Sequence, residues 1–549
     1  MRAAAQRLQA RVQKRAVHAK LRSAPRVRSL LGMPRARLIA LPSLLLALAL
    51  SACGGGPGSG QADPAGAVPA GASIYLEGVV RPDGSQKEDV LDAARKVLRT
   101  DDPERKLHEL IDKGLAKSDS GDVTYDKDIA PWLGEKAGVW VAGAGRDKPG
   151  YVVVVATKDP EKAQEAIDKG ARADGGKVRE RSYGGVDYQL DQDGVAAGIV
   201  DDFFTVGTEA EFKRTVKAAD GTSLAEDKQY QRTMDGLDGD RVGQFYLDLG
   251  PFFEQVLKDD PKTAGDVQQF RSIFPVDQLG PVGGALLADG DRIAVDTVTR
   301  GKGTDALEAL GPLAWTGSTP LIGELPGDAW LALGSPDVGA SVKTLFNRAA
   351  GAFGGAAATQ QLKQRYGMDL ERDVFGWIGD VAVYARGRTK ADLEGAVVIE
   401  ATKPANMQRA FGKLIGVFQQ ESGERLQPTG VQGADLAFKG RGKRAPVIAR
   451  SKDRVVIGLG ETAASDALLH GSKLADSGLY KQGKALLGDD AEPAFLLSMP
   501  DVIAAVEASG DADAHFARAK PYLDAFSVIV SGGSLQDDEA RTRSAAGLK

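Results

Sequence analysis

The sequence predicts an α+β fold built from two tandem copies of a mixed domain, with mostly antiparallel sheets packed by helices. Three observations lead to this prediction. Short strand patterns recur and are joined by tight turns, helical patterns lie between groups of strands, and segments of the first half match segments of the second half in the same order. The length of 549 residues allows two large domains.

The first copy begins with a strand and two helices. Residues 73–78 favour a strand, whereas residues 86–99 and 104–115 carry apolar residues at three- and four-residue spacing, which favours helices. A further helix is predicted from Pro160, with Asp159 as its cap, because proline is favoured in the first helical turn. Strands are predicted at residues 137–142, 151–156, 186–190, 195–200 and 203–207.

Two Asp-Gly pairs predict hairpins. Asp193-Gly194 separates two short strand patterns, and Asp289-Gly290 separates residues 282–288 from residues 292–298. Asp-Gly is favoured in two-residue hairpin turns, which join antiparallel strands. These hairpins therefore favour antiparallel sheets.

The two halves match at nearly constant separation. The segment Asp-x-x-x-Trp-x-Gly occurs twice, 245 residues apart, and Phe245-Tyr246-Leu247 matches Phe495-Leu496-Leu497 at a separation of 250. We therefore predict a first repeat over residues 73–318 and a second over residues 319–549. The copies either form separate domains or interlock, since repeats often bury surface against each other.

The repeated Asp-x-x-x-Trp-x-Gly segment has two interpretations. Its residues are Asp128, Trp132 and Gly134 in the first copy and Asp373, Trp377 and Gly379 in the second. In the interpretation that we favour, the tryptophan fills the core beside a tight turn, the aspartate hydrogen-bonds that turn, and the glycine adopts a positive φ. The alternative is a surface aromatic that stacks on carbohydrate.

The N-terminal segment predicts a lipoprotein signal. Residues 38–52 form an uncharged run rich in Leu and Ala, with Arg35 and Arg37 just before it. The run ends in the lipobox Leu50, Ser51 and Ala52, followed by Cys53. Cys53 is the single cysteine of the chain, and its thiol is predicted to receive a diacylglycerol before cleavage on its N-terminal side. Plain secretion and an uncleaved anchor are the alternatives.

The signal divides the N-terminal region into a leader and a tether. Residues 1–52 form the leader and signal peptide, in which we favour translation from Met33 over a functional basic arm at residues 1–32. Residues 53–72 are rich in Gly, Pro and Ala and predict a flexible tether with a reach of roughly 25 Å. The folded body is thus predicted to lie on the extracytoplasmic face of the cell membrane, held by the lipid on Cys53.

Charge excludes nucleic acid as a partner. The leader holds 11 of the 70 Lys/Arg residues and no acid, so 59 basic and 75 acidic residues follow it, with a net charge near −16. A strongly acidic body repels nucleic acids and anionic membrane surfaces. The abundance of Gly and Ala is typical of GC-rich genomes, such as those of actinobacteria.

With these residues in view, the chain resembles a family of uncharacterised exported proteins, frequent in actinobacteria, that is defined only as a domain of unknown function. The resemblance depends on the anchored N-terminus, the Asp128 to Gly134 segment, the strand ending near Thr157 and the Ser-Leu-Ala segment at Ser223. It covers roughly Ala72 to the end and is better in the first copy, because Gly376 replaces Pro131 in the second. The resemblance implies no activity, cofactor or site residue.

The sequence contains no recognisable catalytic or metal set. After the leader, histidine occurs only at His108, His470 and His515, which lie far apart in the sequence and have no counterpart in the other copy. No Gly-x-Ser-x-Gly elbow is present. We therefore predict no catalytic residue, metal or cofactor.

The leading functional hypothesis is a non-enzymatic, lipid-anchored protein that binds an apolar molecule or an envelope protein. A carrier of apolar molecules is its most concrete form. One alternative is an envelope hydrolase with an unrecognised active site. The other is a structural or scaffold module of an envelope complex.

Overall fold

A computed structural model describes residues 61–116, 123–142, 150–173, 178–237, 239–259, 264–273, 278–301, 307, 317–353, 355–442, 445–469, 471–510, 512–536 and 538–549. We refer to residues 61–301 as the N-terminal half and to residues 317–549 as the C-terminal half. In the described part of the chain, no helix combines the length and apolarity that a membrane span requires.

The N-terminal half alternates groups of strands with helices. Its elements in chain order are η2 (Pro64–Ala67), β1 (Ile74–Val79), α3 (Gly84–Leu98), α4 (Pro103–Ala116), η3 (Tyr125–Ile129), β2 (Leu133–Ala142), β3 (Gly150–Thr157), α5 (Pro160–Ala173), β4 (Arg179–Tyr183), β5 (Val186–Leu190), β6 (Val195–Val200), β7 (Phe203–Thr208), α6 (Glu209–Ala219), η4 (Leu224–Glu226), α7 (Lys228–Met234), β8 (Arg241–Leu247), α8 (Leu249–Asp259), α9 (Ala264–Ile273), β9 (Leu279–Ala288) and β10 (Arg292–Gly301).

The C-terminal half follows a closely similar order. Its elements are α12 (Pro320–Glu324), β11 (Leu331–Ser335), α13 (Val338–Phe353), α14 (Gly355–Tyr366), η5 (Glu371–Phe375), β12 (Ile378–Arg386), β13 (Glu394–Ala401), α15 (Pro404–Ser422), β14 (Gln427–Pro428), β15 (Leu436–Lys439), β16 (Pro446–Arg450), β17 (Arg454–Leu459), α16 (Glu461–Leu469), η6 (Leu474–Asp476), α17 (Gly478–Leu487), β18 (Pro493–Ser498), α18 (Met499–Ser509), α19 (Ala514–Leu523), β19 (Phe526–Gln536) and β20 (Glu539–Leu548).

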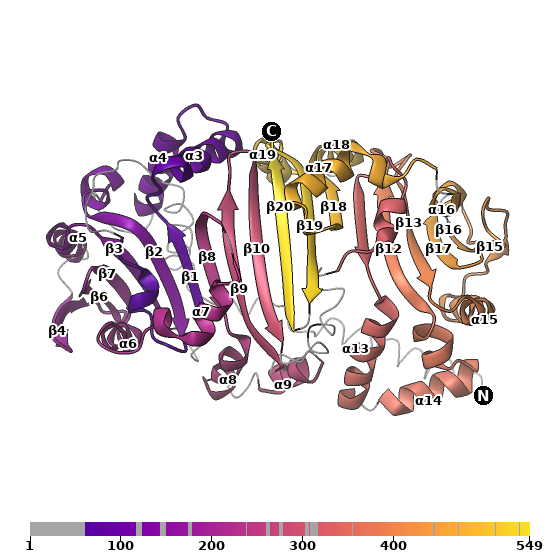
Figure 1. Ribbon diagram of the computed structural model, residues 1–549, viewed down its shortest axis with the longest axis horizontal. Coiled ribbons are helices and arrows are strands. Elements are labelled where there is room, and N and C mark those ends of the chain that lie inside the picture. The colour runs from indigo at the N-terminus through magenta and orange to yellow at the C-terminus, as the bar shows by residue number, and fades with distance from the viewer. Residues whose placement is uncertain are drawn as a thin grey trace, which may run out of the picture.

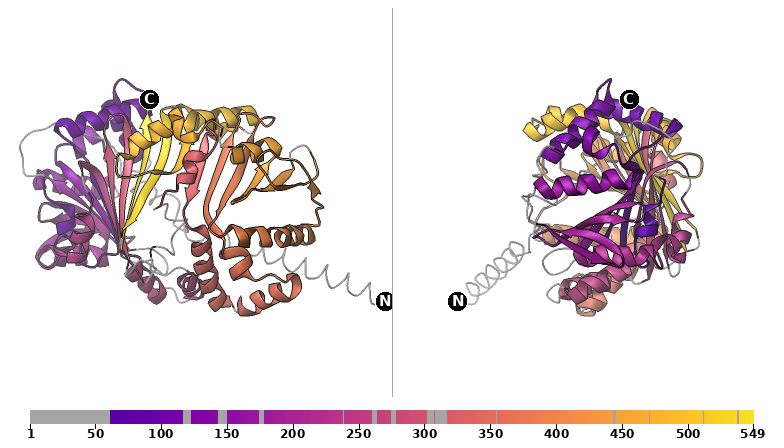
Figure 2. Two further views of the ribbon diagram at one scale, coloured as in Figure 1. Left: turned by 45° about the vertical axis from the view of Figure 1, so that its right-hand side comes forward. Right: turned by 90° about the vertical axis from the view of Figure 1, so that its left-hand side faces the viewer.

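All of these strands belong to one antiparallel sheet that runs along the long axis of the molecule (Figure 1). The order across the sheet is β4-β5-β6-β7-β3-β2-β1-β8-β9-β10-β20-β19-β18-β11-β12-β13-β17-β16-β15-β14. The predicted α+β class with antiparallel strands is therefore confirmed. Helices lie at both ends of the strands in each view (Figures 1 and 2).

Each strand of the N-terminal half has a counterpart in the C-terminal half. From the outer strand β4 inward, and from the outer strand β14 inward, the strands follow one another in the same order of chain position. The innermost strands of the two halves are β10 and β20. Their antiparallel pairing joins the halves, and we call it the seam. The strand order of the first half thus recurs in the second, and the predicted duplication itself stays a prediction.

Local sequence explains the strands and turns. The hairpin turns at Asp193-Gly194, between β5 and β6, and at Asp289-Gly290, between β9 and β10, form as predicted, with φ of +81° at Gly194 and +77° at Gly290. β3 contains four consecutive valines and is buried along most of its length, as a strand covered on both faces should be. Asp159 caps α5 by accepting a hydrogen bond from the Lys162 amide at 3.1 Å.

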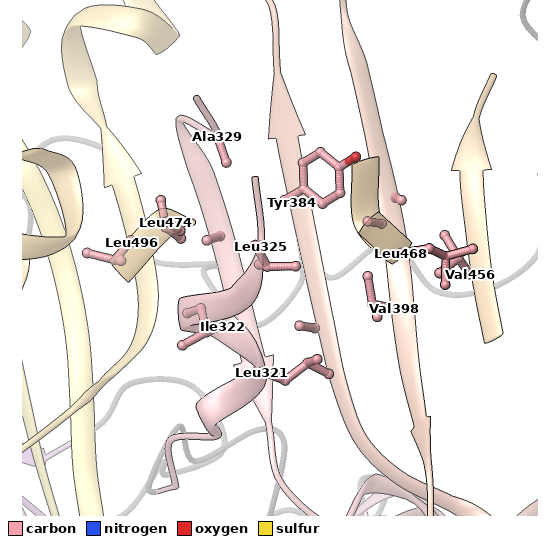
Figure 3. Close-up of a cluster of buried hydrophobic side chains, with 14 of the residues drawn as sticks. Leu321, Ile322, Leu325, Ala329, Tyr384, Val398, Val456, Leu468, Leu474 and Leu496 are labelled. Atoms are coloured by element: carbon pink, nitrogen blue, oxygen red, sulfur yellow. The ribbon is translucent and has the colours of Figure 1, made fainter. Parts of the chain in front are cut away.

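The two faces of the sheet differ. On the face that we call the covered face, α6, α7, α12, α16 and α17 pack against the strands. In the C-terminal half, Leu321 and Ile322 of α12 and the following Leu325 lie between Leu496 and Tyr384 (Figure 3). The Tyr384 hydroxyl donates to the Ala463 carbonyl at 2.8 Å. Burying each such side chain contributes about 1.5–3 kcal/mol.

Candidate functional site

The predicted lipidation site cannot be placed in the structure. The lipobox residues Leu50, Ser51 and Ala52 and the acceptor Cys53 lie outside the described residues. The lipid anchor and the cleavage site therefore stay predictions.

The first Asp-x-x-x-Trp-x-Gly segment forms a π-helical turn, η3. Asp128 accepts a hydrogen bond from the Thr124 amide at 2.8 Å and pairs with Lys169 of α5 at 2.5 Å. Its backbone carbonyl accepts from the Trp132 indole at 2.6 Å. Burial raises the pKa of Asp128, but the hydrogen bonds from Lys169 and Thr124 outweigh it and hold that pKa below its usual value.

The second segment repeats this geometry in the π-helical turn η5. Asp373 accepts from the Asp369 amide at 3.0 Å, and Lys413 of α15 donates to it at 2.9 Å. The Asp373 carbonyl accepts from the Trp377 indole at 2.9 Å. Arg372 adds a contact to the carboxylate at 2.8 Å that the first turn lacks, and it is the main reason that the pKa of Asp373 lies well below its usual value.

These two turns are built into the core. Trp132 and Trp377 are 5% and 2% exposed, and Trp132 stacks on Phe204 with ring centroids 4.8 Å apart. Buried rings are not available to stack on a carbohydrate. The expected role of the glycines is wrong, however, because neither Gly134 nor Gly379 has a positive φ. At Gly379 the constraint is space, since a Cβ would lie 2.8 Å from a Thr402 methyl carbon.

The two described histidines after the leader lie apart from each other. His108 pairs with Asp126 at 3.1 Å and packs against the Tyr125 ring at 4.3 Å. His515 is exposed in the first turn of α19, with Arg518 at 3.1 Å. His470 lies outside the described residues. Neither described histidine lines the hollows discussed below, so a histidine-dependent hydrolase receives no support from them.

A buried polar cluster occurs on the covered face of the N-terminal half. Glu77 of β1, whose side chain is 4% exposed, accepts from the Tyr75 hydroxyl at 2.6 Å and pairs with Lys136 of β2 at 3.2 Å. Burial raises the pKa of Glu77, and the attraction to Lys136 opposes that shift. Sequence reasoning did not single out this cluster, because its three residues belong to no recognisable motif.

The cluster is absent from the other half. Ala332 and Gly334 occupy the places of Tyr75 and Glu77 when the pairing of β11 with β12 is compared with that of β1 with β2. All charges in the cluster are paired, and neither hollow reaches it. We therefore regard it as a structural ion pair.

Two hollows open to solvent lie in the C-terminal half. The smaller, of about 350 Å³, lies on α17 and is lined by Lys481, Lys484 and Asp489 among others. The larger, of about 630 Å³, lies at one end of β12, β11, β18 and β19, beside the first turns of α17 and α18. Its lining includes Trp330, Arg388 and Asp501. Both hollows have charged residues in their lining. Among the described residues, no group of carboxylate, histidine or cysteine side chains could hold a metal ion.

The face opposite the covered face carries partly exposed apolar side chains across its central strands. We call it the open face. Leu76 of the internal strand β1 is 46% exposed and lies opposite Phe245 of β8. Directly paired residues share a face, so the registers assign the set to this side of the sheet. The set comprises Ile74, Leu76, Phe245, Leu247 and Leu286 in the N-terminal half, and Leu331, Leu333, Phe495, Leu497 and Ile529 in the C-terminal half.

Between the two apolar groups, small polar residues cross the seam. Thr297 lies opposite Thr542, and Ser531 lies opposite Ser544 with their hydroxyl oxygens 2.9 Å apart. Figure 1 shows α3 and α19 at one end of these central strands and α9 and α13 at the other. The open face thus has two apolar regions, one per half, separated by a hydroxyl-rich strip.

A comparison with family models identifies the class of protein to which the chain belongs. The model described as "Protein of unknown function (DUF3352)" matches residues 100–436. The match covers more than half of the sequence, so the chain belongs to this family. The predicted membership of a family of unknown function is therefore confirmed, and the description names no activity.

Comparisons with individual proteins add little. The structure titled "Structure of crystal form I of TP0453" is 13% identical and covers 44% of this chain and 79% of that chain, with a TM-score of 0.24. Crystal form IV of TP0453 is 14% identical and covers 43% of this chain and 80% of that chain, with a TM-score of 0.23. At these scores the likeness supports neither a fold nor a function for this chain. The curated proteins contain no match.

Proposed function

We propose that the protein is a lipid-anchored, extracytoplasmic and non-enzymatic binding protein that holds the acyl chains of a lipid on its open face. The observation that carries the proposal is the set of apolar side chains on internal strands, of which Leu76 is 46% exposed. An exposed apolar patch often marks a binding surface. Antiparallel sheets with one solvated face usually carry polar residues there.

The geometry suits chains better than a compact ligand. The apolar residues follow one another across β1, β8 and β9 in one half and across β11, β18 and β19 in the other. Strands in a sheet lie about 4.8 Å apart, so three neighbouring strands present an apolar strip about 10 Å wide. The open face is a better place for acyl chains than either hollow, because both hollows have charged residues in their lining.

The predicted lipid anchor would keep the open face close to a source of lipids. A diacylglycerol on Cys53 and a tether with a reach of roughly 25 Å would keep the body close to a bilayer, where lipids are available. A net charge near −16 after the leader opposes flat adsorption to an anionic membrane surface. Uptake of single lipid molecules agrees with this charge better than membrane coating does.

The experiment is lipid mass spectrometry of the full chain purified from membranes in detergent. The wild type is expected to copurify with a lipid at a reproducible ratio. Leu76→Glu places a charge among the apolar residues of the open face and is expected to reduce the ratio at least about fivefold, because a carboxylate against acyl chains is strongly disfavoured. The N-terminal peptide of the same sample should carry the mass of a diacylglycerol on Cys53.

The matched control is Leu469→Glu. Leu469 is also 46% exposed, but it ends α16, which packs on the covered face. This variant is expected to retain the wild-type lipid ratio. A wild type without lipid, or equal ratios in the two variants, would contradict the lipid-binding proposal, and a reproducible protein partner in place of lipid would favour the scaffold alternative. An unmodified Cys53 would contradict the anchor alone.

A further inference from the structure

A second site, independent of the open face, is indicated by the larger hollow. Its volume of about 630 Å³ lies within the range of small-ligand sites. It is formed by the segments just before β11 and just after β12, by the adjoining ends of β18 and β19, and by the first turns of α17 and α18. Neither the sequence motifs nor the family description assigns a role to this place.

The hollow contains one aromatic residue that the fold itself does not require. Trp330 lines it, and its backbone carbonyl accepts from the Ser498 amide at 2.8 Å. In the N-terminal half the same backbone bond is made by Ser73, whose carbonyl accepts from the Asp248 amide at 2.7 Å. A serine is therefore sufficient at this position for the backbone arrangement, and the indole ring is an addition.

The Trp330 ring is held in place. Its indole nitrogen donates to the Gly387 carbonyl at 2.6 Å, and its side chain is half-buried. That bond uses the single polar atom of the side chain, so the ring offers only its apolar surface to a ligand.

Polar groups around the ring are also fixed. Asp501 accepts from the Nε atom of Arg388 at 2.6 Å and from the Ser498 hydroxyl. Asp392 accepts from the Arg388 and Thr389 amides, which fixes the loop after β12. Preorganised polar groups lose little entropy when a ligand binds.

Two other polar side chains in the lining are available for hydrogen bonds with a ligand. The Gln482 amide and the Ser527 hydroxyl line the hollow and make no hydrogen bond to the described residues. They could donate to or accept from a ligand without breaking an internal bond.

The charges of the lining restrict the ligand. Asp328, Asp392 and Asp501 contribute three carboxylates, against the guanidinium of Arg388 in the lining and that of Arg386, which lies 3.5 Å from Asp328. This excess of negative charge opposes phosphates, sulfates and carboxylates. The ligand that these groups fit is uncharged, rich in hydroxyl groups and flat on one apolar side.

We propose that this hollow binds a neutral saccharide. The C–H face of a pyranose ring packs on the indole of Trp330. Its hydroxyl groups donate to the carboxylates of Asp392 and Asp501 and exchange hydrogen bonds with Gln482 and Ser527.

The test is isothermal titration calorimetry on the full chain, in a detergent without a sugar head group. The probes are the neutral disaccharides maltose, cellobiose, trehalose and N,N′-diacetylchitobiose, with glucose 6-phosphate as the charged probe. At least one neutral disaccharide is expected to bind, and glucose 6-phosphate is expected to bind more weakly than that disaccharide. Trp330→Ser is expected to weaken binding about tenfold, which corresponds to about 1.4 kcal/mol, because the apolar contact with the indole ring is lost.

Trp330→Ser introduces the residue that the equivalent position of the other half contains, so it is expected to fold, and its thermal transition checks this. Gln482→Ala provides a second variant at an exposed side chain and should weaken binding about threefold. Tyr522→Ser is the control, because Tyr522 is 50% exposed on α19 and does not line the hollow. Absence of binding by all four disaccharides, unchanged binding in Trp330→Ser, or tighter binding of glucose 6-phosphate would each overturn the proposal.

Discussion

At the scale of single residues, the most consistent feature is a carboxylate that organises a π-helical turn in each half. Asp128 and Asp373 each accept an amide hydrogen bond, pair with a lysine from the following helix and offer their carbonyl to a tryptophan indole. Because these groups are largely buried, loss of the negative charge leaves the amide and ammonium donors poorly satisfied. The aspartate is thus a structural residue.

Asp373→Asn is expected to lower the free energy of unfolding by about 1–3 kcal/mol at neutral pH, because the buried donors lose a charged acceptor. The pKa of Asp373 is depressed in the folded state, so its contribution is complete above its unfolded pKa of about 3.9 and is lost as the pH falls below that value. Urea unfolding at pH 7 and below pH 4 measures the difference, which should shrink in acid.

Asp453→Asn provides the control for this prediction. Asp453 is exposed, and among the described residues its hydrogen bonding is limited to its backbone carbonyl, which accepts from the Ala401 amide. The control variant should unfold like the wild type at both pH values. An Asp373→Asn variant as stable as the wild type at pH 7 would remove the structural role of this carboxylate.

Sequence reasoning located these residues but not all of their functions. The recurrence of Asp, Trp and Gly at one spacing marked the turns, and the apolar character of tryptophan favoured burial. The partners Lys169 and Lys413 lie 41 and 40 residues from the aspartates, so local pattern could not predict them. Sequence matching gave Trp330 no role of its own, and the structure shows that its counterpart in the other half is Ser73.

At the scale of elements, close pairing of strands restricts side-chain volume at particular positions. Gly207 of β7 lies against β3, and a Cβ there would lie 2.2 Å from the Tyr151 carbonyl oxygen and 2.8 Å from the Val152 Cα atom. Backbone atoms cannot move aside as the end of a flexible side chain can. The tight fit of β7 against β3 therefore depends on glycine.

Gly207→Ala is expected to destabilise the protein by about 1–3 kcal/mol, because overpacking against a strand backbone forces the strands apart. Gly416→Ala is the matched comparison, since Gly416 is exposed in α15 and an added Cβ would meet no atom within 4 Å. That change should stabilise the protein by about 0.5–1 kcal/mol through helix propensity. Chemical denaturation of both variants measures the two effects, and a neutral Gly207→Ala would contradict the packing argument.

Periodicity and turn residues predicted much of the element order in the N-terminal half. The Asp-Gly turns and the alternating strands around them follow from local chemistry. β4 was not predicted, because its sequence is polar and four of its five residues are exposed. The separation of 245 between matching residues also changes to 244 after the tryptophan, where Trp140 corresponds to Tyr384. A β-bulge in β2 accommodates the extra residue, and such a shift has no clear signal in the sequence.

At the scale of the whole molecule, the seam joins the halves through equivalent strands. Nine residue pairs match β10 with β20, and the middle pair is Asp296 with Arg543. Each is the fifth residue of its strand. In a two-fold symmetric contact the same residue would meet itself on the axis, and like charges there would repel. This chain instead has opposite charges, with Arg543 donating to both carboxylate oxygens of Asp296 at 2.7 and 2.6 Å.

Further contacts cross the seam on either side. α9 of the N-terminal half contacts α13, and α19 of the C-terminal half contacts α3. The second pair is the counterpart of the first, because α19 corresponds to α9 and α3 to α13. The two halves are therefore joined by helix contacts as well as by the seam. Sequence matching could not predict that β10 pairs with β20, because similarity between the halves does not show which strands are hydrogen-bonded to each other.

The charge pair gives a test of the seam. Asp296→Arg and Arg543→Asp are each expected to destabilise the protein by about 1–3 kcal/mol, because each places like charges opposite one another and leaves a half-buried group unpaired. The double variant Asp296→Arg/Arg543→Asp restores opposite charges and should regain at least half of the summed loss. A double-mutant cycle by urea denaturation measures the coupling.

Lys343 and Glu371 form the comparison for the cycle. They are 42% and 61% exposed and pair at 2.5 Å between α13 and η5, both in the C-terminal half. Reversal of this pair should change the unfolding free energy by less than about 1 kcal/mol. If the double variant at Asp296 and Arg543 is destabilised by the sum of the two single effects, the two residues are not coupled. Such a result would show that this pair does not stabilise the seam.

The seam also has a consequence for the nascent polypeptide. β10 and its partner β20 are separated by all of residues 302–538, so a ribosome delivers the partner long after β10 has left the exit tunnel. Contacts so distant in sequence close slowly, and an unpaired strand is a template for intermolecular aggregation. Arg292, Asp296 and Arg300 lie at every fourth position of β10, along the edge that stays unpaired until β20 has been synthesised. Charged side chains on an unpaired edge strand oppose pairing with the edges of other molecules. The charged residues of β10 that later contact the C-terminal half are therefore expected to reduce aggregation of the growing chain first.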